Sequence, residues 1–178
     1  KTFITNGYLC DICVTAVKTD PQLGAKGISL LLMEADMEGF TKGEPFEKVG
    51  LHAQDTCELF FDNVKVPKEN LIGKEGEGFK LAMEGLDGGR INIAACSIGT
   101  AQKSLALSIN HVTERKQFGQ AISEFQATQF KLADMATELE ASRLLIYRAA
   151  DILDKQNANA GSACAMAKRL ATDLASKI

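Results

Sequence analysis

The sequence predicts an α+β protein: a truncated antiparallel β-barrel or sandwich, followed by the long antiparallel helices of a truncated four-helix bundle. Two observations predict this division. All three prolines, Pro21, Pro45 and Pro67, lie in the first 67 residues. Beyond about residue 76 apolar residues recur every three, four or seven positions, which is the spacing of one helical face. We therefore expect a partial β-domain over residues 1–70 and a partial helical domain over residues 71–178.

Short β-branched and aromatic runs fill the first part. They read "FIT", "ICVTAVKT", "GISLLLMEA" and "CELFFDNVKV", and turn-forming residues separate them, as is typical of antiparallel strands. Pro67 cannot serve a central strand, so we expect "VPKEN" to close the β-domain. The opening "KTFITNG" resembles the interior of a strand, so we expect the natural chain to begin earlier.

A helix of about 30 residues, roughly 45 Å long, is expected from Ser123, which forms a capping-box pattern with Gln126. Residues 91–113 and 159–178 are its expected helical neighbours. Four small residues predict close helix contact: Ala94, Ala95, Gly99 and Ala101. The predicted buried face consists of Phe125, Leu132, Met135, Leu139, Ile146, Ala149 and Leu153. No glycine or proline ends the last stretch, so we expect the chain to stop within a helix.

Composition excludes several classes of protein. With 46% hydrophobic and 24% charged residues, the chain is globular and not disordered. A net charge of -3 offers no basic face for nucleic acid. No apolar run approaches the roughly 18 to 20 residues that span a membrane, which predicts a soluble chain. The five dispersed cysteines predict free thiols in a reducing compartment.

Motifs for metal and nucleophilic chemistry are weak or absent. Cys10 and Cys13 form one C-x-x-C, but a second pair is lacking, and His52 and His111 are distant in sequence. A P-loop, a G-x-G-x-x-G after a strand, an H-E-x-x-H and a G-x-S-x-G are all missing. The sequence therefore offers no metal ligand set and no candidate for nucleophilic or phosphoryl-transfer chemistry.

The segment "ERKQFG", residues 114–119, has two interpretations. Arg115 and Lys116 can complement the dipole at the end of a helix, with Gly119 forming the turn and Phe118 filling the helix junction. Alternatively, Arg115 binds a phosphate or carboxylate while Phe118 packs against a flat ligand. The residues alone leave both open.

The segment "GLDGGRIN", residues 85–92, predicts a kinked turn just before a helix, with Arg90 in the first helical turn. Arg90 either pairs with Asp87 or joins backbone N–H groups in an anion-binding corner. Near the start, the pattern around Thr5 and Phe3 is most simply that of a barrel strand.

Four collinear stretches together resemble the acyl-CoA dehydrogenase family. They are "FITNG", "GLHAQDTCELFFDNVKVPKENLIGKEGEGF", "GLDGGRINIAA" and "ERKQFGQAISEFQATQFKLADMATELEASRLL". The resemblance implies an N-terminal helical domain, a middle β-domain and a C-terminal four-helix domain, assembled around FAD as a homotetramer or homodimer. This chain would hold most of the β-domain and the first helices of the C-terminal domain.

The resemblance also implies a reaction. A carboxylate removes the α-proton of an acyl-CoA while the β-hydrogen leaves as hydride to the flavin, giving a trans-2-enoyl-CoA. Thr5 would donate to the flavin ring and Phe3 would cover one of its faces, with Ile4 between them. Arg115 would reach the FAD pyrophosphate of a neighbouring subunit. The remaining implied flavin contacts are Lys116, Gln117, Phe118, Phe125 and Gln126, and the implied lining of the acyl-CoA channel is Asp87, Gly88, Gly89 and Arg90.

One departure from the family bears on the catalytic base. Isovaleryl-type and long-chain-type members carry the base as a glutamate just before the arginine that matches Arg90, where this chain has Gly89. We therefore expect the base downstream, no catalytic residue in this chain, and no activity from the fragment alone. Two segments give conflicting indications of the length of the substrate's acyl chain. Residues 27–61 resemble long-chain-type members, whereas residues 85–102 resemble short- or branched-chain-type members.

The expected electron acceptor is an electron-transferring flavoprotein. The expected location is the mitochondrial matrix in a eukaryote and the cytoplasm in a bacterium. An acyl-CoA oxidase and a noncatalytic assembly module on the same scaffold remain the alternatives.

Overall fold

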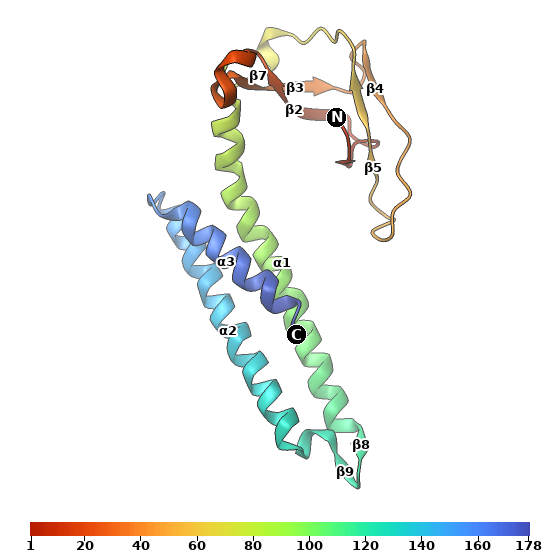
Figure 1. Cartoon of the computed structure of the whole chain (residues 1–178), viewed down its shortest axis with the longest axis vertical. Coiled ribbons are helices and arrows are strands. Elements are labelled where there is room, and N and C mark those ends of the chain that lie inside the picture. Colours follow the sequence, from red (N-terminus) through yellow and green to blue (C-terminus); the bar gives the residue numbers. More distant parts are fainter. The chain divides into compact units, whose positions relative to one another are not determined.

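The computed structural model describes all 178 residues, which divide into two compact units. The β unit is Lys1–Met83 and the helical unit is Glu84–Ile178. Figure 1 shows the strands of the first and the helices of the second. The mixed α and β content confirms the predicted fold class.

The strands of the β unit are short and pair antiparallel. β2 pairs with β3 from Ile12↔Glu34 to Lys18↔Ile28, and β7 pairs with β3 through Leu30↔Ile72. β1 pairs with β5, and β4 pairs with β6. The bounds are β1 Ile4–Thr5, β2 Ile12–Lys18, β3 Ile28–Glu34, β4 Phe40–Lys42, β5 Thr56–Cys57, β6 Leu59–Phe61 and β7 Leu71–Ile72. The antiparallel pairing is confirmed, but the sheets remain separate and form no closed barrel.

The β unit continues past Pro67, so the expectation that "VPKEN" closes it is wrong. A single 3-10 turn, Lys68–Asn70, leads into β7, which returns to the edge of β3. The side chain of Asn70 donates from Nδ2 to the carbonyl oxygen of Leu32 at 2.9 Å, which fixes this return. Pro67 precedes the turn and is not in a strand, so its missing N–H costs no ladder hydrogen bond. Other 3-10 segments are Pro21–Gly27 and Ile122–Glu124.

A small apolar core fixes the strand β1 to the rest of the β unit. Its fully or nearly buried members are Met33, Phe40, Cys57 and Leu59. Cys57 pairs with Ile4 of β1. A Cβ atom placed on Gly7 would lie only 2.9 Å from Cys57 Sγ, so the turn after β1 needs glycine there to pack this closely. The position of β1 is therefore set by packing around Cys57.

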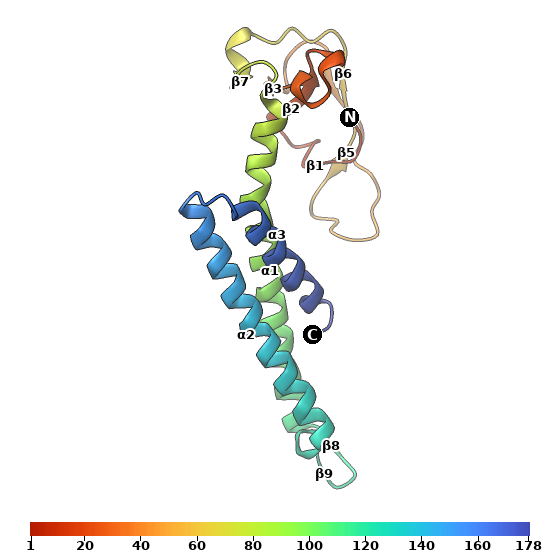
Figure 2. The ribbon, with the colours of Figure 1, turned by 60° about the vertical axis from the view of Figure 1, so that its left-hand side comes forward.

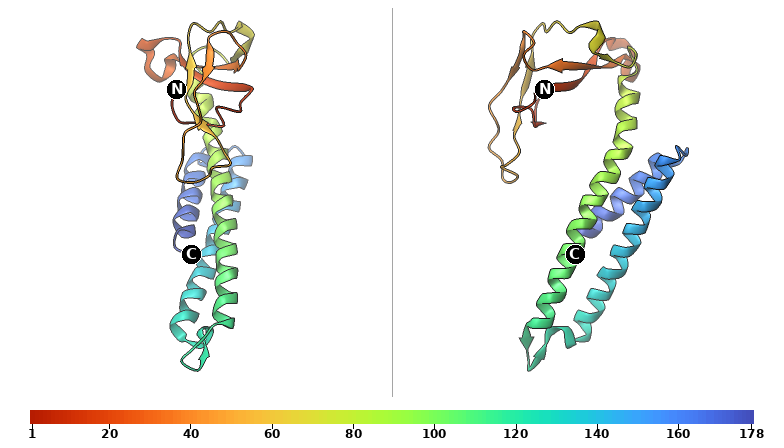
Figure 3. Two further views of the ribbon diagram at one scale, coloured as in Figure 1. Left: turned by 90° about the vertical axis from the view of Figure 1, so that its right-hand side faces the viewer. Right: turned by 180° about the vertical axis from the view of Figure 1, so that it is seen from behind.

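The helical unit contains long helices that share one core. They are α1 Gly78–Glu114, whose first turns belong to the β unit, α2 Gln126–Asp154 and α3 Ala160–Ala175. α1 and α2 lie side by side in opposite directions (Figure 3). The predicted buried face of α2 is confirmed for Leu132, Met135, Leu139, Ile146 and Ala149, which all contribute to the core. It is wrong for Phe125 and Leu153, which are half-buried and belong to no core cluster. None of the helices combines the length and apolarity needed to cross a membrane.

Two other details of the helix predictions are wrong. Ala94 and Ala101 are fully buried as expected, but Ala95 and Gly99 face solvent, because they lie on the other side of α1. The side chain of Ser123 does not cap α2, whose N-cap is Phe125 without a side-chain hydrogen bond. Ser123 lies instead in a 3-10 turn, where its carbonyl oxygen accepts a hydrogen bond from Gln129 Nε2 at 2.9 Å.

Candidate functional site

A tight hairpin joins α1 to α2 and carries most of the residues of "ERKQFG" (Figure 2). α1 ends at Glu114, and the strands β8 (Lys116–Gln117) and β9 (Gln120–Ala121) pair antiparallel. The N–H of Ile122 donates to the carbonyl oxygen of Arg115 at 2.9 Å, which closes the base of the hairpin. The predicted helix end at Arg115 and Lys116 is confirmed, and the hairpin holds both cations in a short rigid segment.

The tip of the hairpin is Phe118–Gly119, and both residues have positive φ, 53° and 84°. Two-residue hairpin loops of type I′ need positive φ at both positions, which glycine adopts freely and phenylalanine does not. Phe118 is nevertheless 94% exposed. Its ring meets Phe125 edge-on, with centroids 6.4 Å apart. The interpretation that Phe118 fills the helix junction is therefore wrong.

The polar side chains of the hairpin have no partners within the chain. Arg115 and Lys116 are exposed and form no ion pair, and Gln117 and Gln126 are exposed as well. Because Arg115 follows the last residue of α1, it can still complement the helix dipole. Free guanidinium N–H groups beside an exposed ring also suit a ligand that carries both phosphate and a flat ring system.

The strand β1 and the residue before it, in the β unit, also combine an exposed aromatic residue of positive φ with a polar side chain that lacks a partner. Phe3 has φ of 57° and is 74% exposed, with its ring 5.4 Å from that of Phe46. Ile4 and Thr5 pair with Cys57 and Thr56. The side chain of Thr5 is exposed and free of hydrogen bonds. Phe3 and Phe118 are the only aromatic residues with positive φ, and strained, exposed aromatic residues are more typical of ligand contacts than of packing.

These two groups fit the parts of a flavin dinucleotide. Phe3, Ile4 and Thr5 offer an exposed ring and a free hydroxyl, which suit the face and edge of a flavin. The six further predicted flavin residues gather separately around the hairpin and the start of α2: Arg115, Lys116, Gln117, Phe118, Phe125 and Gln126. The structure therefore brings the predicted residues together as two sets, one in each unit.

The stretch "GLDGGRIN" is helical, so the predicted kinked turn is wrong. α1 runs without interruption from Gly78 to Glu114, and Arg90 lies well inside it. Glycine accepts helical φ and ψ, and a Cβ atom placed on Gly85, Gly88 or Gly89 would meet no other atom within 4 Å. Nothing in the chain therefore forces a break there.

Asp87 and Arg90 form an ion pair between Asp87 Oδ1 and Arg90 Nη1. The side chain of Arg90 is 38% exposed and that of Asp87 is 22% exposed. The structure thus realises the pairing interpretation and leaves one side of the guanidinium open to solvent. The neighbouring Gly88 is half-buried and Gly89 is exposed.

The thiols are unpaired and unsuited to metal chemistry. All five cysteines are free. Cys10 Sγ donates to the carbonyl oxygen of Gly7 at 3.0 Å, and Cys13 Sγ accepts from Thr15 Oγ1 at 3.4 Å. Burial raises the pKa of the Cys10 thiol, although nearby Lys42 opposes this. No cluster of three His, Cys, Asp or Glu side chains is arranged to hold a metal ion.

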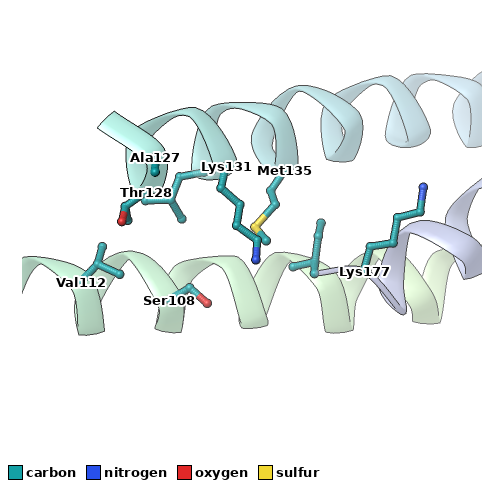
Figure 4. A pocket seen from close by; sticks show the side chains of 9 residues that line it. Ser108, Val112, Ala127, Thr128, Lys131, Met135 and Lys177 are labelled. Carbon is teal, nitrogen blue, oxygen red and sulfur yellow. The ribbon is translucent and has the colours of Figure 1, made fainter. Parts of the chain in front are cut away.

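Sequence reasoning missed a groove of about 490 Å³ in the helical unit (Figure 4). It lies between α1 and α2, beside the residues that follow α3. Its lining comprises Ser108, Val112, Ala127, Thr128, Lys131, Leu132, Met135, Lys177 and Ile178. Leu132 and Met135 were predicted as core, and both are half-buried. The cation Lys131 beside this apolar face was the available signal. None of the predicted ligand-binding residues lines the groove.

Comparisons with known proteins match both units. Residues 1–64 match the model of the acyl-CoA dehydrogenase middle domain, and residues 76–178 match that of the acyl-CoA dehydrogenase C-terminal domain. The mitochondrial isobutyryl-CoA dehydrogenase of Dictyostelium discoideum is 48% identical over the whole chain, which covers 43% of that protein.

Two solved structures extend these matches. A chain from a study of the electron transferring flavoprotein of Acidaminococcus fermentans is 49% identical, with a TM-score of 0.89 over 98% of this chain and 46% of that chain. The structure of PigA with FAD and proline is 30% identical, with a TM-score of 0.92 over 98% of this chain and 45% of that one.

This chain spans less than half the length of these proteins. The C-terminal domain model alone covers more than half of the chain, and the middle domain model covers most of the rest. The chain belongs to the acyl-CoA dehydrogenase family.

Proposed function

We propose that the complete protein is an FAD-dependent acyl-CoA dehydrogenase that converts an acyl-CoA into a trans-2-enoyl-CoA. The observation that carries this proposal is family membership through two successive domains, the middle and the C-terminal one. When bound, FAD would accept the hydride that leaves the β-carbon of the substrate. The residues of this chain would bind and orient the cofactor and the substrate.

The flavin ring would lie against β1. Thr5 has a free hydroxyl that can donate a hydrogen bond to the ring, and Phe3 exposes a face large enough to cover it. Ile4 is half-buried beside them and fixes the strand through its pairing with Cys57. The solved structure of PigA with FAD, at 30% identity, supports a flavin for this fold.

The hairpin would serve the cofactor of another subunit. The resemblance to the family implies that the arginine matching Arg115 reaches the FAD pyrophosphate of a neighbouring subunit. Arg115 would therefore bind the pyrophosphate of a neighbouring copy, with Lys116, Gln117 and Phe118 beside it. This supports a homotetramer or homodimer.

The catalytic base would come from the part of the protein outside this chain. Gly89 has no side chain and cannot remove a proton. We therefore expect the 178-residue fragment to be inactive by itself.

A short or branched acyl-CoA is the proposed substrate class, because isobutyryl-CoA dehydrogenase is 48% identical to this chain. Such a substrate would connect the protein to fatty acid metabolism or branched-chain amino acid degradation. An electron-transferring flavoprotein is the proposed acceptor, supported by the 49% identical chain from Acidaminococcus fermentans. The proposed location is the mitochondrial matrix in a eukaryote and the cytoplasm in a bacterium.

The test uses the full-length protein. We expect a yellow protein whose flavin absorbance bleaches without oxygen when isobutyryl-CoA or butyryl-CoA is added, and less with palmitoyl-CoA. Reoxidation by electron-transferring flavoprotein without peroxide would support the dehydrogenase over the oxidase. A colourless protein, or a flavin that no acyl-CoA bleaches, would refute the proposal and favour the noncatalytic assembly module.

A further inference from the structure

The first turn of α3 faces the carboxylate of Asp87 on α1. A Cβ atom placed on Gly161 would lie 3.4 Å from Asp87 Oδ2 and 3.6 Å from Asp87 Oδ1. The nearest atoms to that position all belong to Asp87. The carboxylate therefore occupies the space that a longer side chain at position 161 would need.

The start of α3 favours a negative charge at this place. α3 begins at Ala160, and its cap residue Asn159 makes no side-chain hydrogen bond to the first turn. The first N–H groups of a helix lack partners within the helix, and they give its N-terminus a partial positive charge. A carboxylate close to this turn is stabilised by that partial charge.

Small side chains allow α3 to approach α1 this closely. Ala163 is 2% exposed, and Cys164 is completely buried. Burial raises the pKa of the Cys164 thiol, the charge of Asp87 raises it further, and Arg90 acts against both. The buried thiol thus lies close enough to both charges to sense them, which supports packing of the ion pair on α3.

An ion pair between residues three apart on an isolated helix is weak. Such a pair alone would not hold the side chain of Arg90 in one rotamer. In this structure the Asp87 carboxylate pairs with Arg90 and also lies against Gly161 in the first turn of α3. The direction of the exposed guanidinium thus depends on a contact between two helices.

We propose that Gly161 is a positioning residue for acyl-CoA binding, acting through Asp87 on Arg90. The absence of a side chain longer than a methyl group at position 161 leaves room for the Asp87 carboxylate against α3, and this carboxylate in turn points the guanidinium of Arg90 toward the ligand. The identity of the ligand rests on the proposed function. The contact itself rests on the geometry of α1 and α3.

The first test compares Gly161→Leu with Gly161→Ala in the full-length, flavin-loaded protein. Alanine would make an ordinary contact with Asp87, so we expect its KM for isobutyryl-CoA to stay within about twofold. Leucine displaces the carboxylate, and we expect KM to rise roughly tenfold with kcat little changed, because ground-state binding is lost. Gly99→Leu, at an open position on α1, is the matched control and should change neither constant. If Gly161→Leu does not fold, Gly161→Val is used with the same expectation.

A double-mutant cycle separates positioning from general packing. If Gly161 acts through Asp87, the leucine variant should raise KM in the wild-type background but add little in an Asp87→Asn background. Equal rises in both backgrounds, or an unchanged KM in the wild-type background, would overturn the proposal.

Melting temperatures of the same four proteins are measured beside KM and need no substrate. If the melting-temperature shifts are non-additive but no acyl-CoA reduces the flavin, the contact is supported and the proposed function is refuted. Additive shifts in an active protein would refute the contact alone.

Discussion

The two arginines at opposite ends of the helical unit differ in what surrounds them. Arg90 is paired with Asp87, and that carboxylate lies against the first turn of α3. Arg115 is exposed and unpaired beside Phe118, a residue with positive φ and almost no contact with the rest of the chain. The first site is organised by the chain itself. The second presents an unpaired charge and an aromatic residue of positive φ, and both are exposed to solvent.

The glycines of the two sites differ in the same way. Gly119 has φ of 84°, a conformation that only glycine adopts without strain. Gly88 and Gly89 are helical, and a side chain on either would meet nothing within 4 Å. The hairpin therefore needs its glycine for folding, whereas α1 tolerates its glycines at a cost in helix stability. The following predictions test this difference.

The largest expected effect belongs to Arg115→Ala in the full-length protein. Removal of a charge-assisted contact to the pyrophosphate costs about 2 kcal/mol, which is roughly a 30-fold loss of FAD affinity. The melting temperature of the flavin-free protein should change little, since Arg115 has no partner in the chain. Flavin content after dialysis and titration of FAD into the apoprotein measure the two quantities.

The control for Arg115 is Arg148→Ala. Arg148 is an exposed cation of α2 outside the hairpin and should leave FAD affinity unchanged. Equal flavin retention by wild type and Arg115→Ala would contradict the clamp and favour the helix-dipole interpretation of this residue.

Gly119→Ala should destabilise the protein by about 1–2 kcal/mol, because alanine must adopt the left-handed conformation at the tip of the hairpin. Denaturant unfolding measures this change. Gly119→Asn is the control, since asparagine tolerates positive φ better, and its loss should be smaller. Similar losses for both variants would mean that the turn itself relaxes on mutation.

The spacing of apolar residues and the positions of turn-forming residues made most of the fold predictable from sequence. The apolar spacing around Leu139 and Ile146 identified the buried face of α2, and Gly119 identified the turn before it. The β-branched runs identified β2 and β3, which pair with each other over seven residues each. These features depend on local residue choice, which a single sequence records.

The errors arose where contacts distant in sequence decide the outcome. The glycines in "GLDGGRIN" suggested a turn, but the stretch is helical because helix-forming residues flank it on both sides within α1. β7 is only two residues long and exists because β3 has a free edge for it. The contact between Gly161 and Asp87 joins residues 74 positions apart, and local patterns carry no trace of it. The residues predicted to contact flavin and acyl-CoA could be named only through the resemblance to the family.

Gly88→Ala tests the other side of the comparison and should stabilise the full-length protein by about 0.5–1 kcal/mol. Alanine favours the helix over the unfolded chain, and open space surrounds position 88. Ala95→Gly, at an exposed position of the same helix, is the matched reverse change and should destabilise by a similar amount. A gain in stability accompanied by a higher KM for acyl-CoA would indicate that the glycine is kept for the ligand. A loss of stability would show that α1 is not regular at this point.

The smallest expected effect concerns pH and the thiol of Cys164. Burial holds its pKa above the ordinary value of 9.0, so the folded state retains the proton more tightly than the unfolded chain does. This contribution to stability is complete below about pH 9 and is lost as pH rises through the folded-state pKa. Cys164→Ala should therefore lose less stability than wild type between about pH 8 and about pH 10, while being less stable at both because of the missing sulfur. Urea unfolding at the two pH values measures the difference.

Cys96→Ala, at an exposed position, should keep the pH dependence of wild type. An alkaline loss in Cys164→Ala as large as in wild type would mean that the thiol beside Asp87 and Arg90 is not buried, and that α3 does not pack on the ion pair.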